Sequence, residues 1–67
     1  MNKFRERLNK ALQENKISQS ELARKIGMSK TIVNNYCSGK RETSLDALIL
    51  ICNALEESAD YLLGIIN

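Results

Sequence analysis

Four neighbouring side chains have the chemistry to recognise the edges of nucleic-acid bases: Lys30, Thr31, Asn34 and Asn35. The ammonium of Lys30 can donate to guanine O6 and N7, and the amide of Asn35 can pair with adenine N6 and N7. Thr31 offers its methyl group to the methyl of thymine. Asn34 suits either a base or a phosphate. These residue types indicate recognition by hydrogen bonding rather than bond-making chemistry.

The sequence lacks the residue combinations typical of enzymes and metal centres. Its 67 residues include no histidine and only two cysteines. No paired carboxylates in a credible cleft and no phosphate-binding glycine loop are present, so we expect no catalytic residue and no cofactor. A metal site is not expected either, because its usual ligands are missing. Nothing in the sequence indicates a small-molecule ligand.

The four side chains fall in the second of two short helices predicted within residues 19–38. In the first helix, Leu22 and Ile26 lie one turn apart on a face that we expect to be buried. Gly27 is expected to end it, because glycine adopts positive φ without a Cβ clash. Ser29 is placed to cap the second helix with its hydroxyl. Two short helices joined by such a tight turn form a helix-turn-helix.

At these residues the chain closely resembles the lambda-repressor-like, Cro/cI-type (XRE) helix-turn-helix family. The matching segments extend over nearly the whole chain and include SQ-SELA at 18–23, IG-MS at 26–29, Gly39-Lys40 and YLLG at 61–64. The resemblance implies an all-α fold: one compact five-helix domain over residues 1–67, with the helix-turn-helix at its second and third helices. It also implies that Lys30, Thr31 and Asn35 occupy base-reading positions.

Phosphate contacts are expected at the edges of the helix-turn-helix. The resemblance implies that Gln19 contacts a phosphate and braces a side chain of the recognition helix. Its place at a helix N-terminus, where free N–H groups attract anions, makes that contact physically reasonable. We assign Ser29, Lys40 and Arg41 to the same phosphate-contacting set. The two cations follow Gly39, and they can bind phosphate or probe a minor groove.

Charge is divided unevenly along the chain. All ten Lys and Arg lie in residues 1–41. Residues 1–44 hold ten basic and four acidic side chains, a net charge of +6. Residues 45–67 hold four acidic side chains and no basic one, a net charge of −4. Such polarity is typical of a surface that faces phosphate at one end only. We therefore expect double-stranded DNA as the partner.

Three further helices are predicted around the helix-turn-helix. The first spans residues 2–15. Each of its basic side chains can reach a phosphate or simply be solvated: Lys3, Arg5, Arg7 and Lys10. The fourth follows Ser44 and is nearly all apolar, which predicts a central buried element. Its apolar residues are Leu45, Leu48, Ile49, Ile51, Cys52 and Leu55. The fifth follows Ser58 and runs to Gly64.

The positions of Leu12 and Cys37 depart together from the family pattern. Many relatives carry arginine and glutamate there, joined in a buried salt bridge. Because both residues are apolar here, we expect them to touch in the core, since replacing a whole buried pair is often neutral or stabilising. We also expect both cysteines, Cys37 and Cys52, to be reduced core residues rather than a disulfide.

A homodimer is predicted because one recognition helix covers only a few base pairs. A two-fold dimer would place two such helices about 34 Å apart on a near-palindromic operator. We predict its interface in the acidic C-terminal third, at Tyr61, Leu62, Ile65 and Ile66. Alternatively, Leu62 and Leu63 complete the core of the monomer while Ile65 and Ile66 fray.

The resemblance implies a cytoplasmic, non-enzymatic transcriptional regulator of bacterial or phage origin. Its function would be sequence-specific binding to double-stranded DNA, with repression by blocking polymerase. No membrane role is expected, because no apolar run approaches the roughly 20 residues of a membrane span. Two alternatives remain: a protein-interaction module built on the same fold, and the DNA-binding part of a longer regulator.

Overall fold

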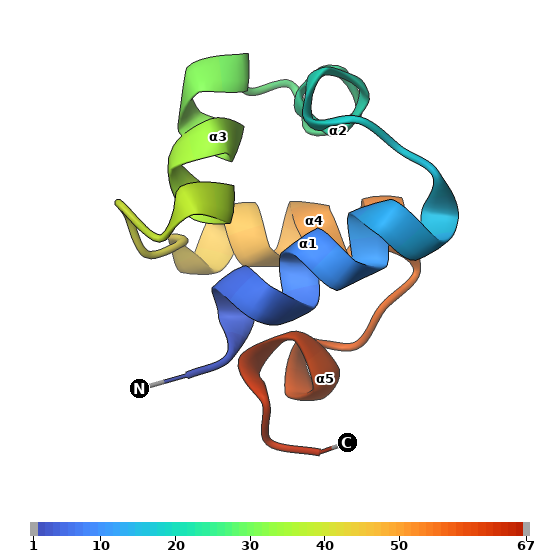
Figure 1. The fold of residues 1–67 in the computed structure, drawn as a ribbon, viewed down its shortest axis with the longest axis vertical. Coiled ribbons are helices and arrows are strands. Elements are labelled where there is room, and N and C mark those ends of the chain that lie inside the picture. Colours follow the sequence, from blue (N-terminus) through green and yellow to red (C-terminus); the bar gives the residue numbers. More distant parts are fainter. Residues whose placement is uncertain (1, 67) are drawn as a thin grey trace.

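Five helices make up most of the computed structural model, which describes residues 2–66 (Figure 1). They are α1 (Phe4–Asn15), α2 (Gln19–Ile26), α3 (Lys30–Ser38), α4 (Leu45–Leu55) and α5 (Ala59–Leu63). No strand occurs in this part of the chain. The predicted five-helix fold, with the helix-turn-helix at α2 and α3, is confirmed.

Serine side chains begin four of the five helices. Ser18 Oγ accepts from the Glu21 backbone N–H at 3.1 Å, and Glu21 Oε1 accepts from the Ser18 N–H at 3.1 Å, which completes a capping box. These hydrogen bonds lower the pKa of the Glu21 carboxyl. Ser29, Ser44 and Ser58 cap α3, α4 and α5 in the same way. Each such cap typically contributes about 1 kcal/mol, so helix boundaries are set locally.

The start of α1 differs from the prediction by two residues. Helix α1 begins at Phe4 rather than at residue 2. Asn2 Oδ1 accepts a hydrogen bond from the Phe4 N–H at 2.9 Å. This contact satisfies one of the free N–H groups at the helix end and leaves residues 2 and 3 outside the helix.

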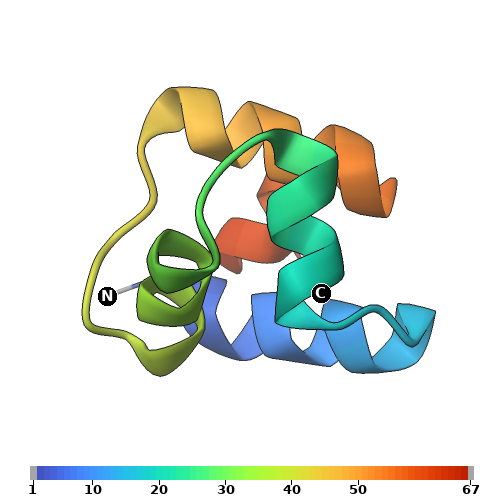
Figure 2. The same cartoon turned by 90° about the horizontal axis from the view of Figure 1, so that it is seen from above.

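The core lies where all five helices meet. In Figure 1, α2 and α3 lie at the top, α5 at the bottom, and α1 in front of α4. The view in Figure 2 shows α2 and α3 between α1 and α4. Fully buried side chains come from every helix: Phe4, Leu8, Leu22, Val33, Ile51 and Leu62. The Phe4 ring meets the Tyr36 ring edge-on, with centroids 6.1 Å apart.

Helix α4 is buried on one face only, which corrects the prediction of a central buried element. Its buried residues are Ala47, Leu48, Ile51 and Leu55. Leu45 is 80% exposed, Ile49 58% and Leu50 44%. The other helices cover one side of α4, and the 3.6-residue period of the helix turns these three side chains to solvent.

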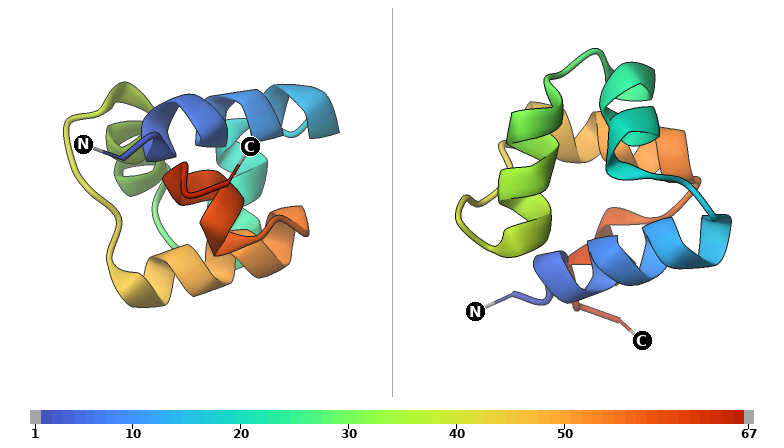
Figure 3. Two further views of the ribbon diagram at one scale, coloured as in Figure 1. Left: turned by 90° about the horizontal axis from the view of Figure 1, so that it is seen from below. Right: turned by 45° about the horizontal axis from the view of Figure 1, so that its top comes forward.

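Leu62 follows the alternative prediction, in which it completes the core of the monomer, rather than the predicted interface role. Its side chain is 0% exposed and belongs to the core of its own domain. Helix α5 packs against both α1 and α4, and it lies between them when seen from below (Figure 3, left). Leu62 is therefore not available to a partner in this conformation. Tyr61 is half-buried, and Ile65 and Ile66 are exposed.

None of the helices in the described residues has both the length and the apolar character needed to cross a membrane. Within residues 2–66, no three His, Cys, Asp or Glu side chains are grouped so that they could hold a metal ion.

Candidate nucleic-acid interface

The solvent-facing side of α3 holds the four candidate base-reading residues. Lys30, Thr31 and Asn34 are exposed, and Asn35 is half-buried. The opposite side of the helix carries the buried residues Val33, Tyr36 and Cys37. Burial of one side fixes the rotation of α3, so the polar side chains must point away from the core.

Gln19 and Asn34 connect the two helices of the motif. Asn34 Nδ2 donates to Gln19 Oε1 at 3.0 Å. The implied bracing of a recognition-helix side chain by Gln19 is therefore present in the structure. Asn34 keeps one N–H and its carbonyl oxygen for a ligand, and Gln19 keeps its whole NH2 group. Both side chains are thus held in one orientation before any ligand binds.

The hydroxyl of Ser29 both caps α3 and faces solvent. Ser29 Oγ accepts from the Ile32 N–H at 3.2 Å. Its own O–H proton is not used in this contact and can donate to a phosphate. Ile32 itself is half-buried and packs against the core.

The loop after α3 is attached to the end of that helix. The Arg41 backbone N–H donates to the Asn35 carbonyl oxygen at 3.2 Å, and Gly39 N–H donates to the Tyr36 oxygen at 3.3 Å. Lys40 and Arg41 are both exposed. Two cations therefore lie beside the C-terminal end of α3.

Helix α1 supports the same end of α3 through a contact that the sequence did not reveal. Asn9 Nδ2 donates to the Cys37 carbonyl oxygen at 2.9 Å. Leu12 is 5% exposed and Cys37 is 6% exposed, and both belong to the core cluster. Their helices, α1 and α3, pack against each other. No local pattern predicts the Asn9 contact, because an asparagine on an outward face is usually just solvated.

Arg7 was also missed as a structural residue. Its Nη1 donates to the carbonyl oxygens of Tyr61 and Ile66, each at 2.8 Å, and its guanidinium carbon lies 4.6 Å from the Tyr61 ring centroid. Charge-assisted hydrogen bonds and a cation–π contact hold the C-terminal segment against α1. These contacts orient Arg7 toward the C-terminal segment.

Both cysteines are free thiols. Burial raises the pKa of the Cys37 thiol. Burial, followed by the nearby Glu57 carboxylate, raises the pKa of the Cys52 thiol, which is only half-buried. Both groups therefore stay protonated and poorly nucleophilic at neutral pH.

Comparison with known sequences gives a consistent match. The family model described as "Helix-turn-helix" matches residues 8–62. The uncharacterized HTH-type transcriptional regulator YqaE of Bacillus subtilis is 38% identical over 60 residues, which is 90% of this chain and 52% of that protein. The HTH-type transcriptional regulator for conjugative element SXT of Vibrio cholerae is 42% identical over 62 residues, covering 92% of this chain and 28% of that protein. The chain thus spans about half of one relative and about a quarter of the other.

Solved structures with the same arrangement of helices include two well-covered matches. The restriction-modification controller protein C.AhdI of Aeromonas hydrophila superposes with a TM-score of 0.84 at 28% identity, covering 90% of this chain and 91% of that one. The DNA-binding domain of the P22 C2 repressor also superposes with a TM-score of 0.84, at 27% identity, covering 100% of this chain and 96% of that one.

Proposed function

Because this chain belongs to the Cro/cI-type (XRE) helix-turn-helix family, we propose that it binds double-stranded DNA sequence-specifically and regulates transcription as a repressor. The observation that carries this proposal is the outward face of α3. It presents four polar side chains, and the Gln19–Asn34 hydrogen bond orients one of them, Asn34. Pre-oriented donors and acceptors lose little freedom on binding, which favours discrimination between bases.

In the proposed complex, the N-terminal part of α3 enters the major groove. Lys30 donates to guanine, Thr31 contacts a thymine methyl, and Asn35 pairs with adenine. Asn34 contributes its remaining polar atoms from its braced position. A protein bound in this way over a promoter, in the cytoplasm where bacterial DNA lies, blocks polymerase by occupying the site.

Phosphate contacts fix the orientation of α3 in the groove. We assign them to Gln19 and Ser29 at the helix N-termini and to Lys40 and Arg41 in the loop after α3. Such contacts position a protein on the duplex without carrying sequence information themselves. Each neutralised phosphate steepens the slope of log affinity against log salt concentration by about 0.9. Lys40 and Arg41 together should therefore contribute about 2 to this slope for each protomer.

We further propose a homodimer with its interface in the C-terminal third. The exposed large apolar side chains of the described chain all lie there: Leu45, Ile49, Leu50, Ile65 and Ile66. This part of the sequence contains no Lys or Arg. Tyr61 and the two terminal isoleucines remain from the interface predicted by sequence. The α4 side chains add a second apolar surface, and Leu62 is left out because it is buried.

Fluorescence polarisation on a labelled random duplex, repeated from low to moderate salt, tests the DNA-binding proposal. We expect binding whose logarithmic affinity falls linearly with the logarithm of salt concentration. A protein that fails to bind duplex even at low salt would contradict the proposal. The fold would then be better explained as a protein-interaction module.

Asn35 provides a test of base recognition. Asn35→Ala should reduce discrimination at one base position of the preferred site, by about 1–3 kcal/mol, because its bidentate contact to adenine is lost. Lys40→Ala is the matched control, since it should weaken binding to all sequences alike. Competition titrations with single-base variants of the site measure both effects. Asn35 is not a base reader if its alanine variant ranks these sites as the wild type does.

A further inference from the structure

The basic side chains near the start of α1 are held in different places by the structure. The Lys3 backbone N–H donates to the Leu63 carbonyl oxygen at 3.3 Å, and a Cβ at Gly64 would lie 3.0 Å from Lys3 Cβ and Cγ. Arg7 donates to two carbonyl oxygens of the C-terminal segment. These two residues therefore pack against the C-terminal segment of the chain.

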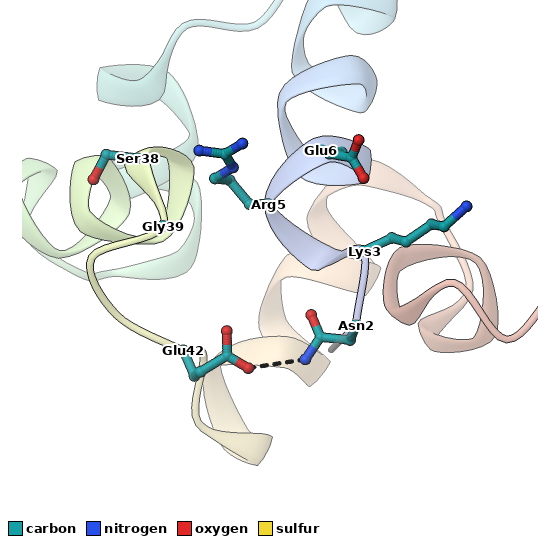
Figure 4. Close-up of a pocket in the computed structure, with 7 residues that line it drawn as sticks. All are labelled: Asn2, Lys3, Arg5, Glu6, Ser38, Gly39 and Glu42. Atoms are coloured by element: carbon teal, nitrogen blue, oxygen red, sulfur yellow. Dashed lines mark hydrogen bonds between the residues drawn. The ribbon is translucent and has the colours of Figure 1, made fainter.

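Arg5 extends in the other direction, across Gly39 at the end of α3. A Cβ at Gly39 would lie 2.8 Å from Arg5 Cδ and 3.6 Å from its Nε and Nη1. Figure 4 shows the side chain pointing from α1 toward Ser38 and Gly39. Gly39 has a φ of 81° and no side chain, so the Arg5 stem can lie directly on its backbone. This packing orients the guanidinium, and among the described residues it involves no acidic side chain that would neutralise the positive charge.

The guanidinium of Arg5 remains free for an anion. Arg5 is exposed, and its side chain has no hydrogen-bond acceptor within residues 2–66, in contrast to Arg7. It borders a hollow of about 320 Å³ that Lys3, Glu6 and Glu42 also line. The Glu42 carboxylate instead accepts from Asn2 Nδ2 at 2.8 Å (Figure 4).

The position of Arg5 continues the proposed DNA-facing surface. Ser38 lies four residues after Asn34 and seven after Thr31, so it shares their face of α3. In the proposed complex, the N-terminal part of α3 enters the major groove. The C-terminal end of the helix, where Lys40, Arg41 and Arg5 all lie, should consequently be nearer to the phosphate backbone that borders the groove.

We propose that Arg5 is a phosphate contact supplied by α1, outside the helix-turn-helix itself. Its guanidinium joins Lys40 and Arg41 on the backbone strand at the C-terminal end of α3. This inference rests on the proposed DNA binding, and it assigns a different role to Lys3 and Arg7, which hold the C-terminal segment.

The test compares salt dependence in three variants by fluorescence polarisation on one duplex. Arg5→Gln should lower the slope of log affinity against log salt by about 0.9, equally for specific and random sequences. Arg5→Lys should restore a slope close to that of the wild type, because it keeps the charge. Lys10→Gln is the matched control: it removes one charge from α1, on the face that follows Arg7, and it should leave the slope unchanged.

Circular dichroism of each variant establishes that the fold is intact. If the wild type binds with a steep slope and Arg5→Gln has the same slope, the Arg5 contact is wrong while the proposed function stands. An equal drop in Lys10→Gln would also overturn it, because the effect would then come from net charge alone. A wild type that does not bind duplex refutes the proposed function itself.

Discussion

Leu12→Arg should destabilise the domain by about 3–5 kcal/mol, the cost of burying a charge without a partner. Leu12 is 5% exposed in a core shared by all five helices, so an arginine there has little access to water. A domain of this size is expected to have a total stability of about 3–10 kcal/mol. The loss should therefore amount to about a third or more of that stability. Urea denaturation followed by circular dichroism measures the loss.

Adding Cys37→Glu to Leu12→Arg should recover much of that stability. The two positions lie in one buried cluster on α1 and α3, and the Asn9 contact to the Cys37 carbonyl holds these helices together. An arginine and a glutamate there can pair and compensate each other's charge. Leu12→Arg with Gln13→Glu serves as control, because an exposed acid on α1 should recover little. A double mutant no more stable than Leu12→Arg alone would contradict the predicted contact.

Ile49→Asp should abolish the dimer and lower the affinity for a two-half-site duplex by about 10²–10⁴-fold, the gain expected from linking two binding modules. Ile49 is 58% exposed and lies one turn from Leu45 on α4, whose only charged residue is Asp46. A carboxylate placed between two such apolar faces is costly to desolvate. Sedimentation measures the association, and circular dichroism confirms the fold.

Aspartates at Ile65 and Ile66 test the surface that the sequence indicated. Arg7 holds this segment along α1, so we expect the segment to contribute less to the dimer interface than α4 does. The aspartate variants should therefore weaken the dimer less than Ile49→Asp. The α4 interface would be refuted by an Ile49→Asp protein that associates as strongly as the wild type. A wild type that stays monomeric at high concentration and on operator DNA would refute the dimer altogether.

The sequence predicted features that depend on neighbouring residues. The serine cap at Ser29 was confirmed, because a cap needs only an N–H a few residues away. The end of α2 at Gly27 was also predicted correctly, since a glycine with positive φ ends a helix through contacts with its own last turn.

Features that depend on distant contacts were not predictable. Helix α4 is apolar nearly all round, so its periodicity did not reveal which side chains would be exposed. Leu62 suits a core or an interface equally well, and only the packing of α5 decides between them. The partners of Arg7 are backbone carbonyls more than 50 residues away, which no local pattern encodes.

Selection of bound duplexes from a random library tests the central claim most directly, because it reports DNA binding, base preference and half-site spacing together. We predict one enriched near-palindromic motif whose half-sites are centred about 10 base pairs apart. Enrichment of no motif above the unselected library would contradict sequence-specific recognition by α3, and a single unpaired half-site would contradict the two-fold dimer.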